Sequence, residues 1–233
     1  MLELAGVEAG YGPSKVLFGV TLEVREGEVV TLLGRNGMGK TTTIRAIMGM
    51  VPPTAGTIRF LGQPVQGQAP HRIAQAGIGL VPEGRQVFSM LSVEENLIAT
   101  AANRRGAPAP WTLERIYATF PALAGRRGQL ASTLSGGEQQ MLAIGRALMT
   151  NPALLILDEA TEGLAPLIRE DIWRCLAGLK AAGQSILVID KNIHALSRLA
   201  DRHFILEKGR ILWSGNSSDL TAGWSRLESH LGV

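Results

Sequence analysis

The sequence is poor in the features that mark several classes of protein. Its 233 residues include a single cysteine, Cys175, which excludes an intramolecular disulfide and indicates a reducing compartment. No apolar run approaches the ~18 residues that span a bilayer. The first residues also lack the basic and apolar regions of a secretory signal. We therefore expect a cytoplasmic protein without a membrane-spanning segment of its own.

Aromatic residues and excess charge are also scarce. Aromatic residues make up 5% of the chain against 45% apolar residues, which predicts a mainly aliphatic core. The formal net charge is only +3 despite a pI near 9.3. The basic pairs at 104–105 and 126–127 are short and separate, so they do not indicate a nucleic-acid-binding surface. The length suits one large α/β domain with an inserted subdomain.

The most specific motif is GRNGMGKTT at residues 34–42, which fits the phosphate-binding pattern G-x-x-x-x-G-K-[ST]. A predicted strand over 28–33 runs into it, and a predicted helix over 41–50 leaves it. The glycines let backbone N–H groups point at phosphate oxygens, and the helix N-terminus adds partial positive charge. Lys40 is expected to reach the outer phosphates and the Thr41 hydroxyl to hold Mg²⁺. The loop residues expected to bind the nucleotide are Arg35, Asn36, Gly37, Met38, Gly39, Lys40, Thr41 and Thr42.

A phosphate site of this kind needs an acidic partner for the metal. The run over 153–157 is entirely apolar, as expected of a strand inside a parallel sheet, and Asp158 and Glu159 follow it directly. Asp158 is expected to bind the metal. Glu159 is placed to act as the general base on an attacking water.

The remaining patterns divide the chain into a core and an insertion. Strands are predicted over 2–7, 20–24, 57–61, 78–81 and 185–189, with a loop over 9–13 and a hairpin over 203–213. Helices are predicted over 70–75, 167–182 and 193–200. Over 92–150 only helices are predicted, one of which opens with a capping box over 92–95. We predict an α/β core of residues 1–88 and 152–233, with an N-terminal antiparallel region, interrupted by a helical subdomain over 89–151.

Residues 134–138 read Leu-Ser-Gly-Gly-Glu, which opens one of these helices. By itself this is an ordinary capping box, but two glycines there each cost about 1 kcal/mol of helix stability and expose N–H groups to an anion. The segment resembles the signature motif of ABC-type ATPases. The phosphate loop, the signature and the acidic strand have the order and spacing of that family, and the resemblance covers nearly the whole chain.

The resemblance implies an ATPase that uses ATP and Mg²⁺ and works as a head-to-tail dimer. Tyr11 corresponds to the aromatic residue that stacks on adenine, and Glu83 to a glutamine that touches Mg²⁺ and the membrane subunit. The metal would thus be held by Thr41, Asp158 and Glu83. The residues that would bind the γ-phosphate held by the partner's loop are Ser135, Gly136, Gly137 and Glu138.

Segments 81–85, 93–97, 135–147 and 163–166 more closely resemble the ATP-binding subunits of branched-chain amino acid importers. This implies a second, different ATPase chain, two membrane permease subunits, indirectly a solute-binding protein, and a place on the inner face of the plasma membrane. The urea-type importer ATPase is the nearest alternative, because residues 161–163 resemble it. The sequence does not identify the solute.

Two positions depart from the family pattern. Ala165 replaces an aspartate that communicates across the dimer, and Lys191 stands where most members have histidine and much of this branch has glutamine. A lysine can contact a γ-phosphate, so Lys191 is a candidate catalytic residue, but it cannot switch protonation near neutral pH. A regulatory subunit with little turnover is therefore an alternative. A soluble ABC ATPase acting on nucleic acid or ribosomes is another alternative. Such proteins often have two fused cassettes or long coiled insertions, and this sequence shows neither.

The apolar run over 87–91 predicts a docking surface around 83–97 for a membrane subunit. The alternative is that these side chains turn into the core of the helical subdomain.

Overall fold

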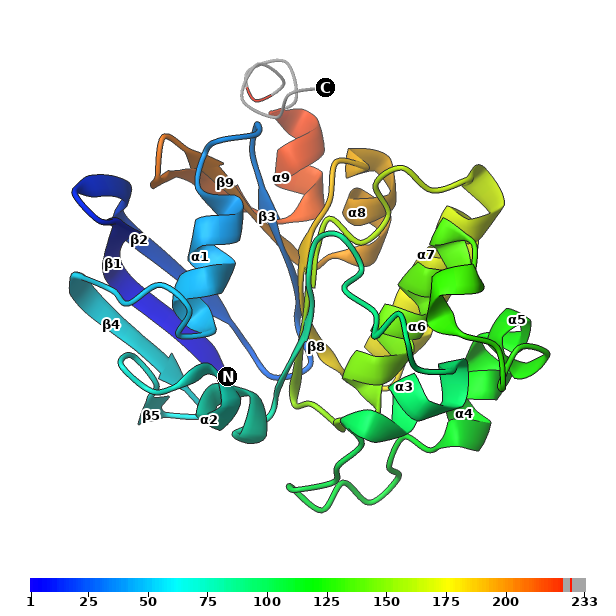
Figure 1. Ribbon diagram of the computed structural model, residues 1–233. Coiled ribbons are helices and arrows are strands. Elements are labelled where there is room, and N and C mark those ends of the chain that lie inside the picture. Colours follow the sequence, from blue (N-terminus) through cyan, green and yellow to red (C-terminus); the bar gives the residue numbers. More distant parts are fainter. Residues whose placement is uncertain (224–226, 228–233) are drawn as a thin grey trace.

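The computed structural model describes residues 1–223 and 227, and Figure 1 shows two sheets flanked by helices. The N-terminal sheet is antiparallel with strand order β2-β1-β4-β5. Its strands are β1 (Leu2–Tyr11), β2 (Ser14–Val24), β4 (Ala55–Phe60) and β5 (Gln63–Pro64). The predicted N-terminal antiparallel region is therefore confirmed.

The second sheet has the order β10-β9-β3-β8-β7-β6 and is parallel from β9 to β6. Its strands are β3 (Val29–Leu33), β6 (Ile78–Val81), β7 (Leu154–Asp158), β8 (Ser185–Ile189), β9 (Arg202–Glu207) and β10 (Arg210–Gly215). The predicted bounds of β6 and β8 are confirmed, and so is the hairpin that β9 and β10 form.

The prediction of a loop over 9–13 is wrong, because β1 continues to Tyr11 and β2 already begins at Ser14. The pairing of these two strands contains three register shifts. Such irregularities interrupt the alternation of apolar and polar residues by which a strand is predicted from sequence. Only the two residues between the strands, including Gly12 with φ 55°, are left for the turn.

The helices of the core are α1 (Lys40–Ile47), α2 (Pro70–Gln75), α7 (Pro166–Ala181), α8 (Ile193–Leu199) and α9 (Ser217–Ala222). Between β6 and β7 lie α3 (Val93–Ala99), α4 (Leu113–Thr119), α5 (Pro121–Ala124), a 3-10 turn (Ala131–Thr133) and α6 (Gly136–Leu148). Helices α3 to α6 gather on one side of the molecule, away from the antiparallel sheet (Figure 1). The predictions did not include α5, the 3-10 turn or α9. The residue bounds of the core and the subdomain stay a prediction.

The parallel sheet is buried on both faces, which accounts for its mainly apolar strands. Val30 and Leu32 of β3 pack in a cluster with the antiparallel sheet and α1. Val29 and Leu33 face a second cluster that reaches α6, α7 and α8. The strand that enters the phosphate loop is thus fixed from both sides.

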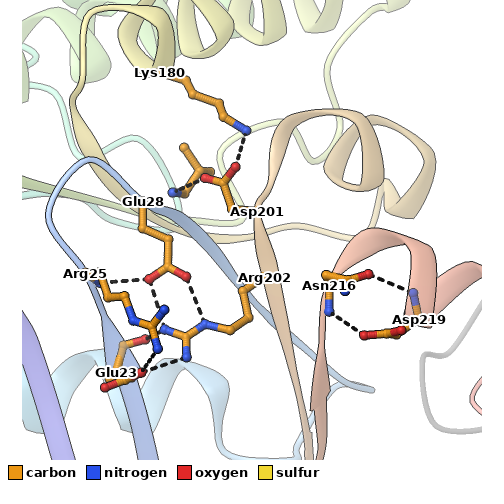
Figure 2. A network of polar contacts seen from close by, with 9 residues as sticks. Glu23, Arg25, Glu28, Lys180, Asp201, Arg202, Asn216 and Asp219 are labelled. Atoms are coloured by element: carbon orange, nitrogen blue, oxygen red, sulfur yellow. Dashed lines mark hydrogen bonds and ion pairs between the residues drawn. The ribbon is translucent and has the colours of Figure 1, made fainter.

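A polar network holds the ends of the strands opposite that loop (Figure 2). Arg202 donates from Nε and Nη2 to the two Glu28 oxygens, each at 2.9 Å, and from Nη1 to Glu23 at 2.9 Å. Asp201 accepts from the Val29 backbone N–H at 2.9 Å and from Lys180 at 2.6 Å. The network joins β2, β3 and β9 at the strand ends that lie away from the phosphate loop. It thereby fixes the position of β3, the strand that enters the loop.

Candidate active site

The phosphate loop lies between β3 and α1 in a conformation that requires glycine. Gly34 and Gly39 have φ values of 141° and 107°. A Cβ at Gly34 would lie 2.3 Å from the carbonyl oxygen of Leu206, and one at Gly39 would lie 2.9 Å from Leu17. The loop borders a cavity of about 260 Å³ lined by Val16, Asn36, Gly37, Gly39, Lys40, Thr41, Thr42, Glu83 and Glu159. Most of the predicted loop residues therefore share one cavity.

Lys40 curls back over the loop, with only 7% of its side chain exposed. Its Nζ donates to the carbonyl oxygens of Gly34 at 2.8 Å and Arg35 at 3.2 Å, and lies 3.9 Å from Glu159 Oε1. Burial lowers the pKa of Lys40, against the attraction of Glu159 and other nearby carboxylates. A buried ammonium group that hydrogen-bonds to backbone carbonyls and lies 3.9 Å from the Glu159 carboxylate is suited to an anionic phosphate.

Asp158 ends β7 with 3% of its surface exposed, and its Oδ1 is buried without a hydrogen-bond partner among the described residues. Burial raises the pKa of Asp158, while a hydrogen bond with Thr41 lowers it and the charge of Glu83 raises it further. An orphaned buried carboxylate oxygen beside a hydroxyl is an incomplete ligand set for a hard cation. The residues present therefore fit Mg²⁺, with Thr41 and Asp158 as the pair in contact.

Glu159 follows Asp158 in the left-handed backbone region, with φ 52°. Its backbone N–H donates to the carbonyl of Ile189 at 2.8 Å, which fixes the turn against β8. A hydrogen bond with the Glu162 carboxyl, followed by burial, raises the pKa of Glu159 to about 7. A non-glycine residue in this conformation is strained, and such residues cluster at functional sites. A carboxylate titrating near neutral pH has the basicity expected of a general base.

Lys191 follows β8 and forms an ion pair with Glu162, and this pair was not among the sequence predictions. The hydrogen bond with Glu162 is the main cause that raises the pKa of Lys191. Glu162 and Glu159 line a second cavity of about 280 Å³ with Glu83, Gly84, Arg85, Gln139 and Gln140. The position of Glu162, three residues after Glu159 in a tight loop, was the available signal. The predicted catalytic role of Lys191 stays a prediction.

Tyr11 lies at the end of β1 and is 44% exposed. Its hydroxyl accepts from Arg45 Nη1 at 3.1 Å. It is not part of the phosphate-loop cavity lining, although Thr42 of that lining hydrogen-bonds to it. An exposed ring at this edge leaves the adenine-stacking role a prediction.

The signature segment begins α6 as a complete capping box. Ser135 Oγ accepts from the Glu138 backbone N–H at 3.4 Å, and Glu138 Oε2 accepts from the Ser135 backbone N–H at 2.8 Å. A Cβ at Gly136 would lie 2.7 to 2.9 Å from the Arg85 guanidinium. The four signature residues do not line the phosphate-loop cavity, and their predicted contact with a partner's γ-phosphate stays a prediction.

Glu83 lines both cavities and precedes an unusual stretch of backbone. Gly84, Arg85 and Gln86 all have left-handed φ values, of 77°, 66° and 47°. Two contacts hold this stretch to α6: Arg85 Nη1 lies 3.5 Å from Gln139 Oε1, and Arg146 Nη2 donates to the Gln86 carbonyl at 2.7 Å. The loop that leaves β6 therefore connects the metal-side residues with the signature helix.

The apolar run over 87–91 divides between core and surface. Val87 packs against the buried cluster, whereas Phe88 is 42% and Met90 79% exposed. The alternative that the whole run turns inward is therefore wrong for Phe88 and Met90. Phe88 also lines a cavity of about 520 Å³ between α2 and α6, together with Met50, Arg104, Arg105 and Arg146 among others.

Among the described residues no helix combines the length and apolar character that a membrane crossing requires.

Comparisons with known proteins show the family to which the chain belongs. The family model for the ABC transporter matches residues 17–162. The high-affinity branched-chain amino acid transport ATP-binding protein BraG of Pseudomonas aeruginosa is 39% identical over the full length of both chains. The Nod factor export ATP-binding protein I of Paraburkholderia xenovorans is 38% identical over 95% of this chain and 72% of its own. A solved ATP-binding subunit of an ABC transporter superposes with a TM-score of 0.85 at 30% identity, covering 97% of this chain and 93% of the other.

Proposed function

The chain belongs to the ABC transporter family as an ATP-hydrolysing subunit, and we propose that it powers the uptake of branched-chain or related small amino acids. The supporting observation is the full-length similarity to a protein named for branched-chain amino acid transport. The Nod factor export relative named above extends beyond the matched region, since the match covers 72% of it. The urea-type importer remains the second candidate because of residues 161–163.

We propose that the cavity beside the phosphate loop binds Mg-ATP. Its loop residues would surround the phosphates, with Lys40 offsetting their charge and Tyr11 against the adenine. Thr41, Asp158 and Glu83 would hold Mg²⁺, which supplies charge neutralisation on the phosphate oxygens. The observation that carries this proposal is the Asp158 oxygen with no hydrogen-bond partner in the described part of the chain, next to the strained Glu159 at the C-terminal edge of the parallel sheet.

Glu159 is the proposed general base. In its ionised form it would accept a proton from a water placed between its carboxylate and the γ-phosphate. Its backbone link to Ile189 fixes the direction from which it can act. Lys40, 3.9 Å away, stabilises that ionised form.

The proposed partners are a second ATPase chain, which the signature residues would contact, and two membrane permease subunits. A solute-binding protein would deliver the solute to the permease subunits. In a head-to-tail dimer the N–H groups of Ser135, Gly136 and Gly137 would contact the phosphate held by the other chain. The 520 Å³ cavity, which Phe88 lines, and the exposed Met90 two residues further along the chain form the proposed docking surface for a permease segment. This would hold the chain on the inner face of the plasma membrane.

The test is ATP-driven uptake of labelled leucine and labelled urea by the complete transporter in proteoliposomes. Leucine uptake supports the importer proposed here, and uptake of urea alone would contradict it. In the same preparation, Glu159→Gln on this subunit should slow turnover by roughly 10²–10⁴-fold, the contribution of a positioned general base. The matched control is Glu170→Gln, an exposed carboxylate on α7. Full turnover with Glu159→Gln, together with a gain from Lys191→His, would instead identify a regulatory subunit.

A further inference from the structure

Two loops at the C-terminal edge of the sheet are joined by two polar links of different character. Residues 159–163 follow β7, and residues 190–192 follow β8. The Thr161 backbone N–H and hydroxyl donate to Asp190 Oδ2 at 3.1 and 2.6 Å, and Thr161 is 3% exposed. The second link is the Lys191–Glu162 ion pair, whose side chains are 47% and 49% exposed.

The buried link is enough to hold the two loops together. It makes two hydrogen bonds to one carboxylate oxygen, and the Glu159 backbone adds a third connection to β8 through Ile189. An exposed ion pair contributes at most about 1 kcal/mol, because water screens it and both side chains lose freedom. The Lys191–Glu162 pair is therefore easy to exchange and is not needed as a clamp.

The pair lies where a phosphate charge would act on it. Burial is the main cause that lowers the pKa of Lys40, and the positive charge of Lys191 contributes to the same shift. The two ammonium groups are thus electrostatic neighbours. Lys40 is also 3.9 Å from Glu159, which shares a cavity lining with Glu162. A terminal phosphate in front of Lys40 would attract Lys191 and repel Glu162.

We propose that Glu162 is a positioning residue that competes with the terminal phosphate of ATP for Lys191. Without that phosphate Glu162 holds the Lys191 ammonium beside the site, and with it Lys191 transfers to the phosphate oxygens. ADP lacks the competing group and leaves the pair intact. Glu162 therefore reduces the preference of the site for ATP over ADP. The proposal rests on the proposed nucleotide site.

The test is a double-mutant cycle on the full-length chain with Mg²⁺, using equilibrium titration of a non-hydrolysable ATP analogue and of ADP. Glu162→Gln should tighten binding of the ATP analogue about three- to fivefold, the range of one exposed ion pair, and leave ADP affinity unchanged. Lys191→Met should weaken binding of the ATP analogue. In the Lys191→Met background, Glu162→Gln should give no gain.

Two further variants separate competition from general charge and from damage to the loop. Glu162→Asp keeps the charge and should return the ATP-to-ADP preference toward the starting value. Glu170→Gln removes one exposed negative charge elsewhere and should leave the preference unchanged. The proposed competition would be overturned if Glu162→Gln lowered the preference for the ATP analogue over ADP or left it unchanged. It would also be overturned if Glu162→Gln still tightened binding of the ATP analogue in the Lys191→Met background. Absence of binding of either nucleotide to the unmodified chain would instead overturn the proposed nucleotide site.

Discussion

Acidification is expected to destabilise this protein through His203, a fully buried residue of β9. Its Nδ1 lies 2.7 Å from Thr31 Oγ1, and its Nε2 lies 2.9 Å from Ser217 Oγ. Ser217 donates its own hydrogen to the Ala200 carbonyl at 3.1 Å, so the imidazole donates from Nε2 and accepts at Nδ1. Protonation would place a hydrogen on Nδ1 against the Thr31 hydroxyl and a charge in an apolar core.

The sign and size of the effect follow from the shifted pKa. Burial lowers the pKa of His203 from 6.5 to about 4, although the nearby Asp201 carboxylate opposes the shift. Below about pH 6.5 His203 takes up a proton in the unfolded chain but not in the folded chain. The stability that neutral His203 contributes to the fold is therefore complete above pH 6.5 and is lost as the pH falls toward 4. Linkage puts the loss at about 2 kcal/mol at pH 5 and about 3 kcal/mol at pH 4.

The assay is urea denaturation followed by tryptophan fluorescence between pH 4.5 and 8, for the unmodified chain, His203→Gln and His71→Gln. His203→Gln should be less stable at pH 7.5, because its amide cannot reproduce both hydrogen bonds. Its stability should, however, fall less steeply, so that the difference from the unmodified chain narrows by about 2 kcal/mol between pH 7.5 and 5. His71 is exposed, and its substitution should preserve the original slope. Parallel pH curves for His203→Gln and the unmodified chain would refute the reasoning.

Lys40→Ala should weaken Mg-ATP binding roughly 10- to 100-fold, since the hydrogen bonds of one buried cation are lost; unchanged affinity in a direct titration would contradict the phosphate site. Arg202→Ala should lower the free energy of unfolding by about 2 kcal/mol, because Glu28 and Glu23 lose a bidentate partner. The control Arg25→Ala, whose side chain is 72% exposed, should lower the free energy of unfolding by less than about 0.5 kcal/mol. Equal losses for Arg25→Ala and Arg202→Ala in urea denaturation would argue against a stabilising role of the network. Met90→Glu should prevent co-purification with the membrane subunits while ATP binding persists, and the equally drastic Leu212→Glu on β10 should not; assembly with both variants would move the docking surface elsewhere.

The parts of the site that the sequence predicted are encoded within short segments. The phosphate loop needs glycines at fixed spacing, and an apolar strand that ends in Asp158 and Glu159 marks the edge of a parallel sheet. Capping boxes at Ser92 and Ser135 also depend on residues only three positions apart, and both are present in the structure. Local chemistry of this kind can be seen without knowing which strands are neighbours.

The missed contacts depend on strand order and backbone conformation. Lys191 meets Glu162 only because β7 and β8 are adjacent and parallel. His203 lies beside Thr31 because β9 pairs with β3. The left-handed stretch over 84–86 contains two non-glycine residues, for which sequence propensity predicts other conformations. The place of Glu162 three residues after Glu159 was a local signal for that residue, but no local pattern predicts its pairing with Lys191, the contact of His203 with Thr31, or the left-handed stretch.

The position of β3 between β8 and β9 has a consequence during synthesis. Both neighbours are made long after β3 and its phosphate loop, since β9 ends at Glu207. At about 5–20 residues per second, a mainly apolar strand with two open edges waits on the order of ten seconds or more for its partners. Parallel pairing over such sequence separations is slow to form and exposed to aggregation. The nascent chain therefore emerges with its nucleotide site unassembled, and this interval is when it most needs a chaperone.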